Sequence, residues 1–343
     1  MLRRRRVLFV LVGVLIVAGL LAVGLGTIWI PPVTTLRLLA WKLGVADAPD
    51  DVPASTAVIL FELRIPRVLL AMLVGSALAA AGALFQALFR NPMADPAIIG
   101  VSSGAALGSI VTILLGGGVL LGGLAVPLAG FAGALAVAIV VYRLGRIGLA
   151  VQVGTLLLAG IAVAAVLSAI ISLIMAFSGE QVRSIYFWLL GGLAGRGWDA
   201  LAVAAPLVAV GVLLAMFGVR DLNAMALGEE RAGQLGVEVE RFKRRTLATG
   251  ALLAAAAVSV AGVIGFVGLM TPHILRLILG ADHRRLLPAV VIGGAAFMVL
   301  ADLAARTLLA PEEIPVGALT ALLGGPFFLY LLRRERTLAA SRG

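Results

Sequence analysis

Long apolar stretches alternate with short polar ones along almost the whole chain. Because the hydrocarbon core of a bilayer is about 30 Å thick, a helix of about 20 apolar residues spans it. The pattern predicts ten spans, the eighth being the shortest: Val7–Trp29, Ile65–Phe89, Ile98–Leu115, Ala125–Leu144, Thr155–Phe177, Ala200–Val219, Leu247–Val267, Pro272–Leu279, Pro288–Leu309 and Val316–Leu332. We therefore expect an all-α, polytopic membrane protein that forms a single transmembrane domain over residues 1–343.

The stretches at the start of the chain refine this picture. Arg3–Arg6 precede the first apolar run as in a signal peptide, but the run is longer than the roughly 7 to 15 residues of a signal sequence. We expect it to remain as the first span. Pro31–Glu62 follows on the outer side, with a predicted surface helix at Thr34–Leu43.

The composition agrees with the hydropathy pattern, and the net positive charge is best explained by membrane topology. Hydrophobic residues make up 62% of the chain and charged residues 13%, whereas soluble domains are roughly 45 to 50% apolar. The net charge of +10 would suit nucleic acid, but in membrane proteins Lys and Arg collect on the cytoplasmic side. Counted from an inside N-terminus, nineteen such residues fall inside and seven outside. This bias predicts that both termini are cytoplasmic and that nucleic acid is not a partner.

Two kinds of enzymatic site are excluded by the residues available. The only lysines, Lys42 and Lys243, do not end a G-x-x-x-x-G-K-[ST] loop, so the chain lacks that ATP-binding motif. The only histidines, His273 and His283, do not form an H-E-x-x-H zinc pair, and cysteine is absent. We expect a protein that is not itself an enzyme and that binds neither a metal ion nor a cofactor.

One apparent hydrolase motif has a simpler interpretation. Gly100, Ser102 and Gly104 match G-x-S-x-G, which requires a strand, a turn and a helix in a nucleophile elbow. Here the triplet opens an apolar span, and Gly108 continues a series of glycines at every fourth position. Such spacing favours close helix packing in lipid.

Charged residues at the outer ends of two spans are candidate functional groups. Arg64 and Arg67 lie one helical turn apart at the start of the second span. They either anchor the helix at the interface or form a positive docking point for an acidic partner, which Arg306 could join. Asp302 lies within the ninth span, four residues before Arg306, so the two can pair on one helix face. An ionisable residue at this depth is either structural or functional.

The cytoplasmic segment of residues 220–245 predicts a contact with another protein. Two short helix-forming pieces meet at Gly228, and the second ends at Gly236. Three apolar residues on this charged segment require a partner to cover them: Met225, Leu227 and Leu235.

Taken in order, the motifs resemble the FecCD family, the permeases of bacterial importers for iron-siderophores, haem and vitamin B12. The resemblance rests on ten segments: Arg64–Arg67, Gln86–Pro96, Gly100–Gly104, Leu156–Gly160, Trp188–Gly192, Leu227–Gly236, Gly265–His273, Asp282–Pro288, Ala301–Asp302 and Glu313–Gly317. It implies the fold of a type II ATP-binding cassette (ABC) importer permease in the bacterial inner membrane. It also implies a homodimer with a central pathway, two cytoplasmic ATPase subunits that use ATP and Mg²⁺, and an outer substrate-binding protein.

The resemblance also assigns roles to individual positions. Arg64, Arg67 and Arg306 match the arginines that receive acidic residues of the binding protein. The coupling helices, which seat in a cleft of the ATPase, correspond to Leu227, Gly228, Glu229, Glu230, Ala232, Leu235 and Gly236. The cytoplasmic gate corresponds to Gln152, Val153, Gly154 and Thr155, although some members have hydroxyl residues in place of Val153 and Gly154. An ion-coupled secondary transporter is the alternative; it would require intramembrane ion-binding groups, and only Asp302 qualifies.

Overall fold

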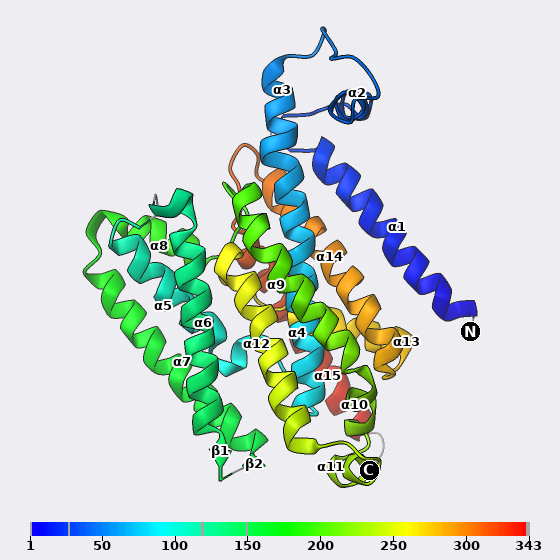
Figure 1. The fold of residues 1–343 in the computed structure, drawn as a ribbon, viewed down its shortest axis with the longest axis vertical. Helices are drawn as coiled ribbons and strands as arrows, with labels where there is room; N and C mark the ends of the chain where they lie inside the picture. The colour runs from blue at the N-terminus through cyan, green and yellow to red at the C-terminus, as the bar shows by residue number, and fades with distance from the viewer. Residues whose placement is uncertain (1, 27, 118–119, 149, 341–343) are drawn as a thin grey trace.

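The computed structural model describes residues 2–26, 28–117, 120–148 and 150–340, and most of them are helical (Figure 1). The strands in these residues are a two-residue antiparallel pair, β1 (Arg146–Ile147) and β2 (Ala150–Val151). The all-α prediction is therefore confirmed. Following the predicted orientation, we call the end of the bundle that carries α2 (Pro32–Lys42) the outer end, and the opposite end, with β1 and β2, the cytoplasmic end (Figure 1).

Ten of the described helices account for the predicted spans. Six are long and apolar enough to cross a bilayer: α1 (Leu2–Gly24), the continuous helix from α3 (Ala54–Val58) to α4 (Ile65–Leu88), α6 (Ala125–Leu144), α7 (Val153–Ala176), α9 (Trp198–Phe217) and α14 (His283–Thr307). Three have shorter apolar stretches: α5 (Val101–Leu114), α13 (Val267–Leu279) and α15 (Val316–Ala340), of which Val316–Leu331 is the apolar part. The tenth, α12 (Val239–Ala261), begins with a charged cytoplasmic turn. The remaining helical turns lie between spans: η2 (Pro96–Ile99), η3 (Leu120–Gly123), η4 (Gly179–Gln181), α8 (Val182–Leu189), α10 (Val219–Met225) and α11 (Glu229–Gln234).

The boundary between the seventh and eighth spans differs from the prediction. The seventh helix, α12, ends at Ala261 rather than Val267, and α13 begins at Val267 rather than Pro272. Between them the backbone is not helical, because Gly262 and Phe266 have left-handed φ angles of 71° and 67°. Apolar side chains continue through this break, so a hydropathy pattern cannot detect it.

The second span also begins earlier than predicted. The surface helix α2 is confirmed, but the chain then enters a 35-residue helix, Ala54–Leu88, that reaches beyond the rest of the bundle (Figure 1). Pro66 lies inside this helix. A π-helical turn, η1 (Ile59–Arg64), directly precedes it, and there Ile65 N–H donates to the Leu60 carbonyl. The wider turn accommodates the proline without ending the helix.

The centre of the molecule is α4, which packs against α9, α12, α13 and α14. Glycines allow the closest approaches: a Cβ at Gly82 would overlap the Gly268 backbone, and one at Gly75 would overlap Gly294. The same packing joins α5 to α6, where Gly104 faces the Gly133 carbonyl. The helix-packing interpretation of this glycine series is thus confirmed.

A second group of helices, α5 to α8, forms a lobe beside α12 (Figure 1). Its helix α7 is the least buried of the six long spans, with Leu158 and Ile161 more than half exposed. The short strands β1 and β2 form a hairpin immediately before α7, at the cytoplasmic end (Figure 1).

Candidate docking and coupling sites

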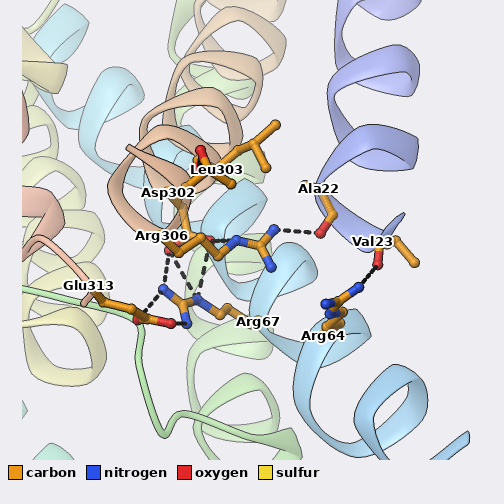
Figure 2. A network of polar contacts seen from close by, with 9 residues as sticks. Ala22, Val23, Arg64, Arg67, Asp302, Leu303, Arg306 and Glu313 are labelled. Carbon is orange, nitrogen blue, oxygen red and sulfur yellow. Dashed lines mark hydrogen bonds and ion pairs between the residues drawn. The ribbon is translucent and has the colours of Figure 1, made fainter. Parts of the chain in front are cut away.

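At the outer end, Arg64 closes the C-terminal end of α1. Its buried guanidinium donates to the carbonyl oxygens of Val23 at 2.9 Å and Gly24 at 2.8 Å, and also to that of Ile28 (Figure 2). The last carbonyls of a helix have no partner within the helix and carry partial negative charge. Arg64 therefore satisfies these acceptors and ties α1 to the long central helix.

Arg67 joins two acidic residues from the far end of the chain. Its Nη2 lies 2.9 Å from Asp302 Oδ1, and its Nη1 and Nη2 each donate to Glu313 at 3.0 Å (Figure 2). The Asp302 side chain is only 1% exposed, whereas that of Glu313 is 34% exposed. Such bidentate, charge-assisted pairing fixes both orientation and distance.

Arg306 completes what we call the outer arginine cluster: Arg64, Arg67, Asp302, Arg306 and Glu313. Its Nε lies 3.4 Å from Asp302 Oδ2, which confirms the predicted pairing, and it donates to the Ala22 carbonyl on α1 (Figure 2). The three arginines and two carboxylates leave the cluster with one excess positive charge. Arg64 and Arg306 are buried, so Arg67 and Glu313 are its accessible members. The docking role of the arginines remains a prediction.

An outer cavity of about 740 Å³ lies beside this cluster. Arg67 and Glu313 contribute to its wall together with Trp188 and the loop of residues 191–197. Glu313 begins one of the segments that carry the resemblance but received no role from the sequence, because it lies in an irregular loop without a periodic pattern.

At the cytoplasmic end, residues 220–245 form what we call the coupling segment, after its predicted role, and its two predicted helical pieces are α10 and α11. They are separated by Gly228, with φ 112°, and Gly236 follows with φ 85°, a conformation that favours glycine. Ala232 is fully buried, whereas the other members of the predicted coupling set are exposed or half-exposed: Leu227, Gly228, Glu229, Glu230, Leu235 and Gly236.

The expectation for the three apolar residues of this segment is partly wrong. Leu227 and Leu235 are 56% and 57% exposed, as expected, but Met225 is buried because α10 packs it against the bundle. The two leucines border a cavity of about 290 Å³ whose wall consists of Arg220, Asn223, Ala224, Leu227, Leu235, Val237 and Arg284. This surface suits a partner side chain that is apolar with an acidic neighbour.

The segment is anchored to the bundle through Asn223. Its amide donates to Asp282 Oδ1 at 2.8 Å and its carbonyl oxygen accepts from His283 N–H, also at 2.8 Å. The hydrogen bond from Asn223 holds the pKa of Asp282 below its usual value. Asp282 in turn caps α14 by accepting from Arg284 N–H.

The predicted gate residues form the start of α7. Gln152 is its N-cap, Val153, Gly154 and Thr155 lie in its first turn, and Thr155 Oγ1 donates to Gln152 Oε1 at 3.3 Å. The preceding hairpin contacts α12: the Val151 N–H donates to Glu240 Oε2 at 2.7 Å. The predicted gate and the predicted coupling residues thus lie at the same end of the molecule, where α12 contacts both α11 and β2, the strand that precedes the predicted gate.

In the part of the chain that the structure describes, six helices are long and apolar enough to cross a membrane and three more are short and apolar, as in a multi-pass membrane protein. The profile of the FecCD transport family matches residues 14–334, and the chain belongs to that family. Its members are permease subunits of ABC importers and are not themselves catalytic; this chain is such a permease.

Relatives and a solved structure agree with this assignment. The chain is 47% identical to the cobalamin import system permease protein BtuC of Halobacterium salinarum, over 82% of this chain and 75% of the relative. It is 45% identical to the hemin transport system permease protein HmuU of Yersinia pestis, over 81% and 84%. A solved metal-chelate type ABC transporter, in an inward-facing conformation, matches with a TM-score of 0.82 and 31% identity, covering 96% of this chain and 99% of that one.

Proposed function

We propose that this chain forms the translocation pathway of an ATP-driven importer for an iron chelate, haem or cobalamin, as a homodimer with both termini in the cytoplasm. The relatives named for cobalamin and hemin support the substrate class. The exposed apolar face of α7 supports a second copy as the partner that encloses the pathway. The chain itself would bind no cofactor.

The observation that carries the proposal is the pair of exposed leucines on the coupling segment. Leu227 and Leu235 border a groove on a segment that is otherwise charged, and apolar patches of this kind mark protein interfaces. A cytoplasmic ATPase would cover them and supply the ATP-binding motif that this chain lacks. Its closure would move the coupling segment and thereby open the gate.

Binding of the ATPase to leucine variants tests this step. Leu235→Ala in the purified permease should weaken the affinity of its cognate ATPase subunit about tenfold, because buried apolar contacts at interfaces dominate affinity. Arg231→Ala changes an exposed charged residue of α11, the helix that ends just before Leu235, and serves as the matched control. Equal affinity for Leu235→Ala and the unchanged permease would refute the assignment.

At the outer end, the binding protein would dock over the outer arginine cluster. Arg67 is the member that a partner carboxylate can reach, in competition with Glu313. Arg64 and Arg306, which are buried, would add positive charge to the site and hold α1, α4 and α14 together.

The ion-coupled alternative gains no support from Asp302. This carboxylate already contacts both Arg67 and Arg306, so it has no free oxygen with which to bind a transported ion. The ATP-driven reading is therefore the one that the contacts favour.

A further inference from the structure

Lys243 is a buried cation that joins three separate segments at the cytoplasmic end. It lies on the first turns of α12, and its side chain is only 7% exposed. Its ammonium lies 2.8 Å from Glu229 Oε2, at the start of α11, and 3.1 Å from Glu240 Oε1 on its own helix. It also donates to the carbonyl oxygen of Val151, at 3.1 Å. An ammonium has three donors, and these three contacts use all of them.

Both backbone groups of Val151 are hydrogen-bonded to side chains of α12. While Lys243 donates to the carbonyl, Glu240 accepts the N–H of the same residue at 2.7 Å. Val151 itself is buried and is the last residue of β2. The next residue along the chain is Gln152, which caps α7, so the clamp on Val151 lies one residue from the predicted gate.

The opposite side of the ammonium faces the coupling segment. Glu229 opens α11 and is about half exposed, and Arg90, beyond the end of α4, is its second cation at 3.8 Å. These three contacts of Lys243 connect α11, α12 and the β1–β2 hairpin through a single atom, Nζ.

The geometry points to Lys243 as the positioning residue that transmits movement of the coupling segment to the gate, an inference that rests on the proposed function. A displacement of α11 carries Glu229 with it. Because the same ammonium holds Val151, the hairpin and the first turn of α7 follow α11. Glu240 keeps the ammonium and Val151 in register during the movement.

If Lys243 only stabilised the fold, its replacement would impair folding or ATPase binding and not specifically the connection between Glu229 and Val151. Glu229 and Glu240 are both almost half exposed, so removal of the ammonium leaves them in contact with water rather than buried without a partner. Lys243→Met preserves the buried length of the side chain and should fold and bind the ATPase normally. What it removes is the connection between Glu229 and Val151.

The test uses the full transporter, with its cognate ATPase and binding protein, in proteoliposomes. Cyanocobalamin, hemin and the iron chelate ferrichrome serve as the transported probes, and transport and ATP hydrolysis are measured in the same vesicles. Lys243→Met should keep ATP hydrolysis close to that of the unchanged complex while substrate transported per ATP falls about fivefold or more. Lys243→Arg, which retains a cation with several donors, should recover part of this ratio. Arg241→Met is the matched control, since Arg241 lies in the same turn and pairs only with exposed Glu238 among the ion pairs described.

The outcomes separate the inference from the proposed function. If the unchanged complex shows no ATP-dependent transport, the proposed function itself fails. If it transports and Lys243→Met keeps the same ratio of transport to ATP hydrolysis, the inference is overturned. If Lys243→Met does not assemble, Glu229→Ala takes its place, because it removes the contact between Lys243 and α11 yet keeps the bond from Lys243 to the Val151 carbonyl. An unchanged ratio of transport to ATP hydrolysis in that variant overturns the inference equally.

Discussion

Arg67 and Asp302 are 235 positions apart in the chain, yet the guanidinium of one and the carboxylate of the other are 2.9 Å apart at the outer end of the bundle (Figure 2). Asp302 also lies within 3.4 Å of Arg306, so one buried carboxylate balances two arginines. The pair joins α4 to α14, and through Arg306 the same carboxylate is connected to the end of α1.

Asp302→Asn should therefore destabilise the protein strongly. Breaking a buried ion pair by removing one partner costs about 3 kcal/mol or more, because the remaining charge is left uncompensated. We expect the melting temperature of the purified protein in detergent to fall by roughly 5 °C or more. Asp51→Asn is the control. Asp51 forms a solvent-exposed ion pair with Arg37, so this substitution should leave the melting temperature nearly unchanged. Equal melting temperatures for the two variants would contradict a structural role for Asp302.

Gly82→Ala tests the packing at the centre of the bundle. The added methyl group would overlap the carbonyl oxygen of Gly268, so α4 and α13 must separate, at a cost of about 1 to 3 kcal/mol. Gly13→Ala is the matched control, because a Cβ there meets no atom within 4 Å. Thermal unfolding of the two variants should show a lower melting temperature only for Gly82→Ala. A normal melting temperature in that variant would mean that the two helices are not in close contact.

The sequence predicted the spans well because hydropathy and length are local properties. It also predicted the Asp302–Arg306 pair, because residues four apart on a helix share a face. It could not predict that Arg67 reaches Asp302, since that contact depends on how α4 and α14 pack. The hydropathy pattern did not predict the break between α12 and α13 at residues 262–266, because the backbone turns there while the side chains remain apolar.

Removing the negative charge of Glu313 should strengthen docking of the binding protein. Glu313 occupies the accessible side of the Arg67 guanidinium, so Glu313→Gln should leave Arg67 freer to bind a partner carboxylate. We expect the binding protein to associate with the nanodisc-embedded variant about threefold more tightly, with a steeper dependence on salt. Glu180→Gln, an exposed acidic change in a loop outside the cluster, is the control. Weaker binding to Glu313→Gln than to the control would count against docking at Arg67.

The orientation can be tested with single cysteines, because the chain has none of its own. Val45, beyond α2, is 79% exposed, and the side chain of Arg241, in the cytoplasmic segment of residues 220–245, is 49% exposed. In intact spheroplasts, a membrane-impermeant maleimide should label Val45→Cys at once and Arg241→Cys only after the membrane is permeabilised. The reverse order would invert the topology and place the coupling segment outside the cell.

The most direct test of the account is transport by the reconstituted protein. Proteoliposomes that contain this chain, its cognate ATPase and its binding protein are assayed for uptake of cyanocobalamin, of hemin and of the iron chelate ferrichrome, with ATP supplied on the ATPase side. The account predicts uptake of at least one of these probes that requires both ATP and the ATPase. Uptake that an ion gradient drives in vesicles containing this chain alone would contradict it.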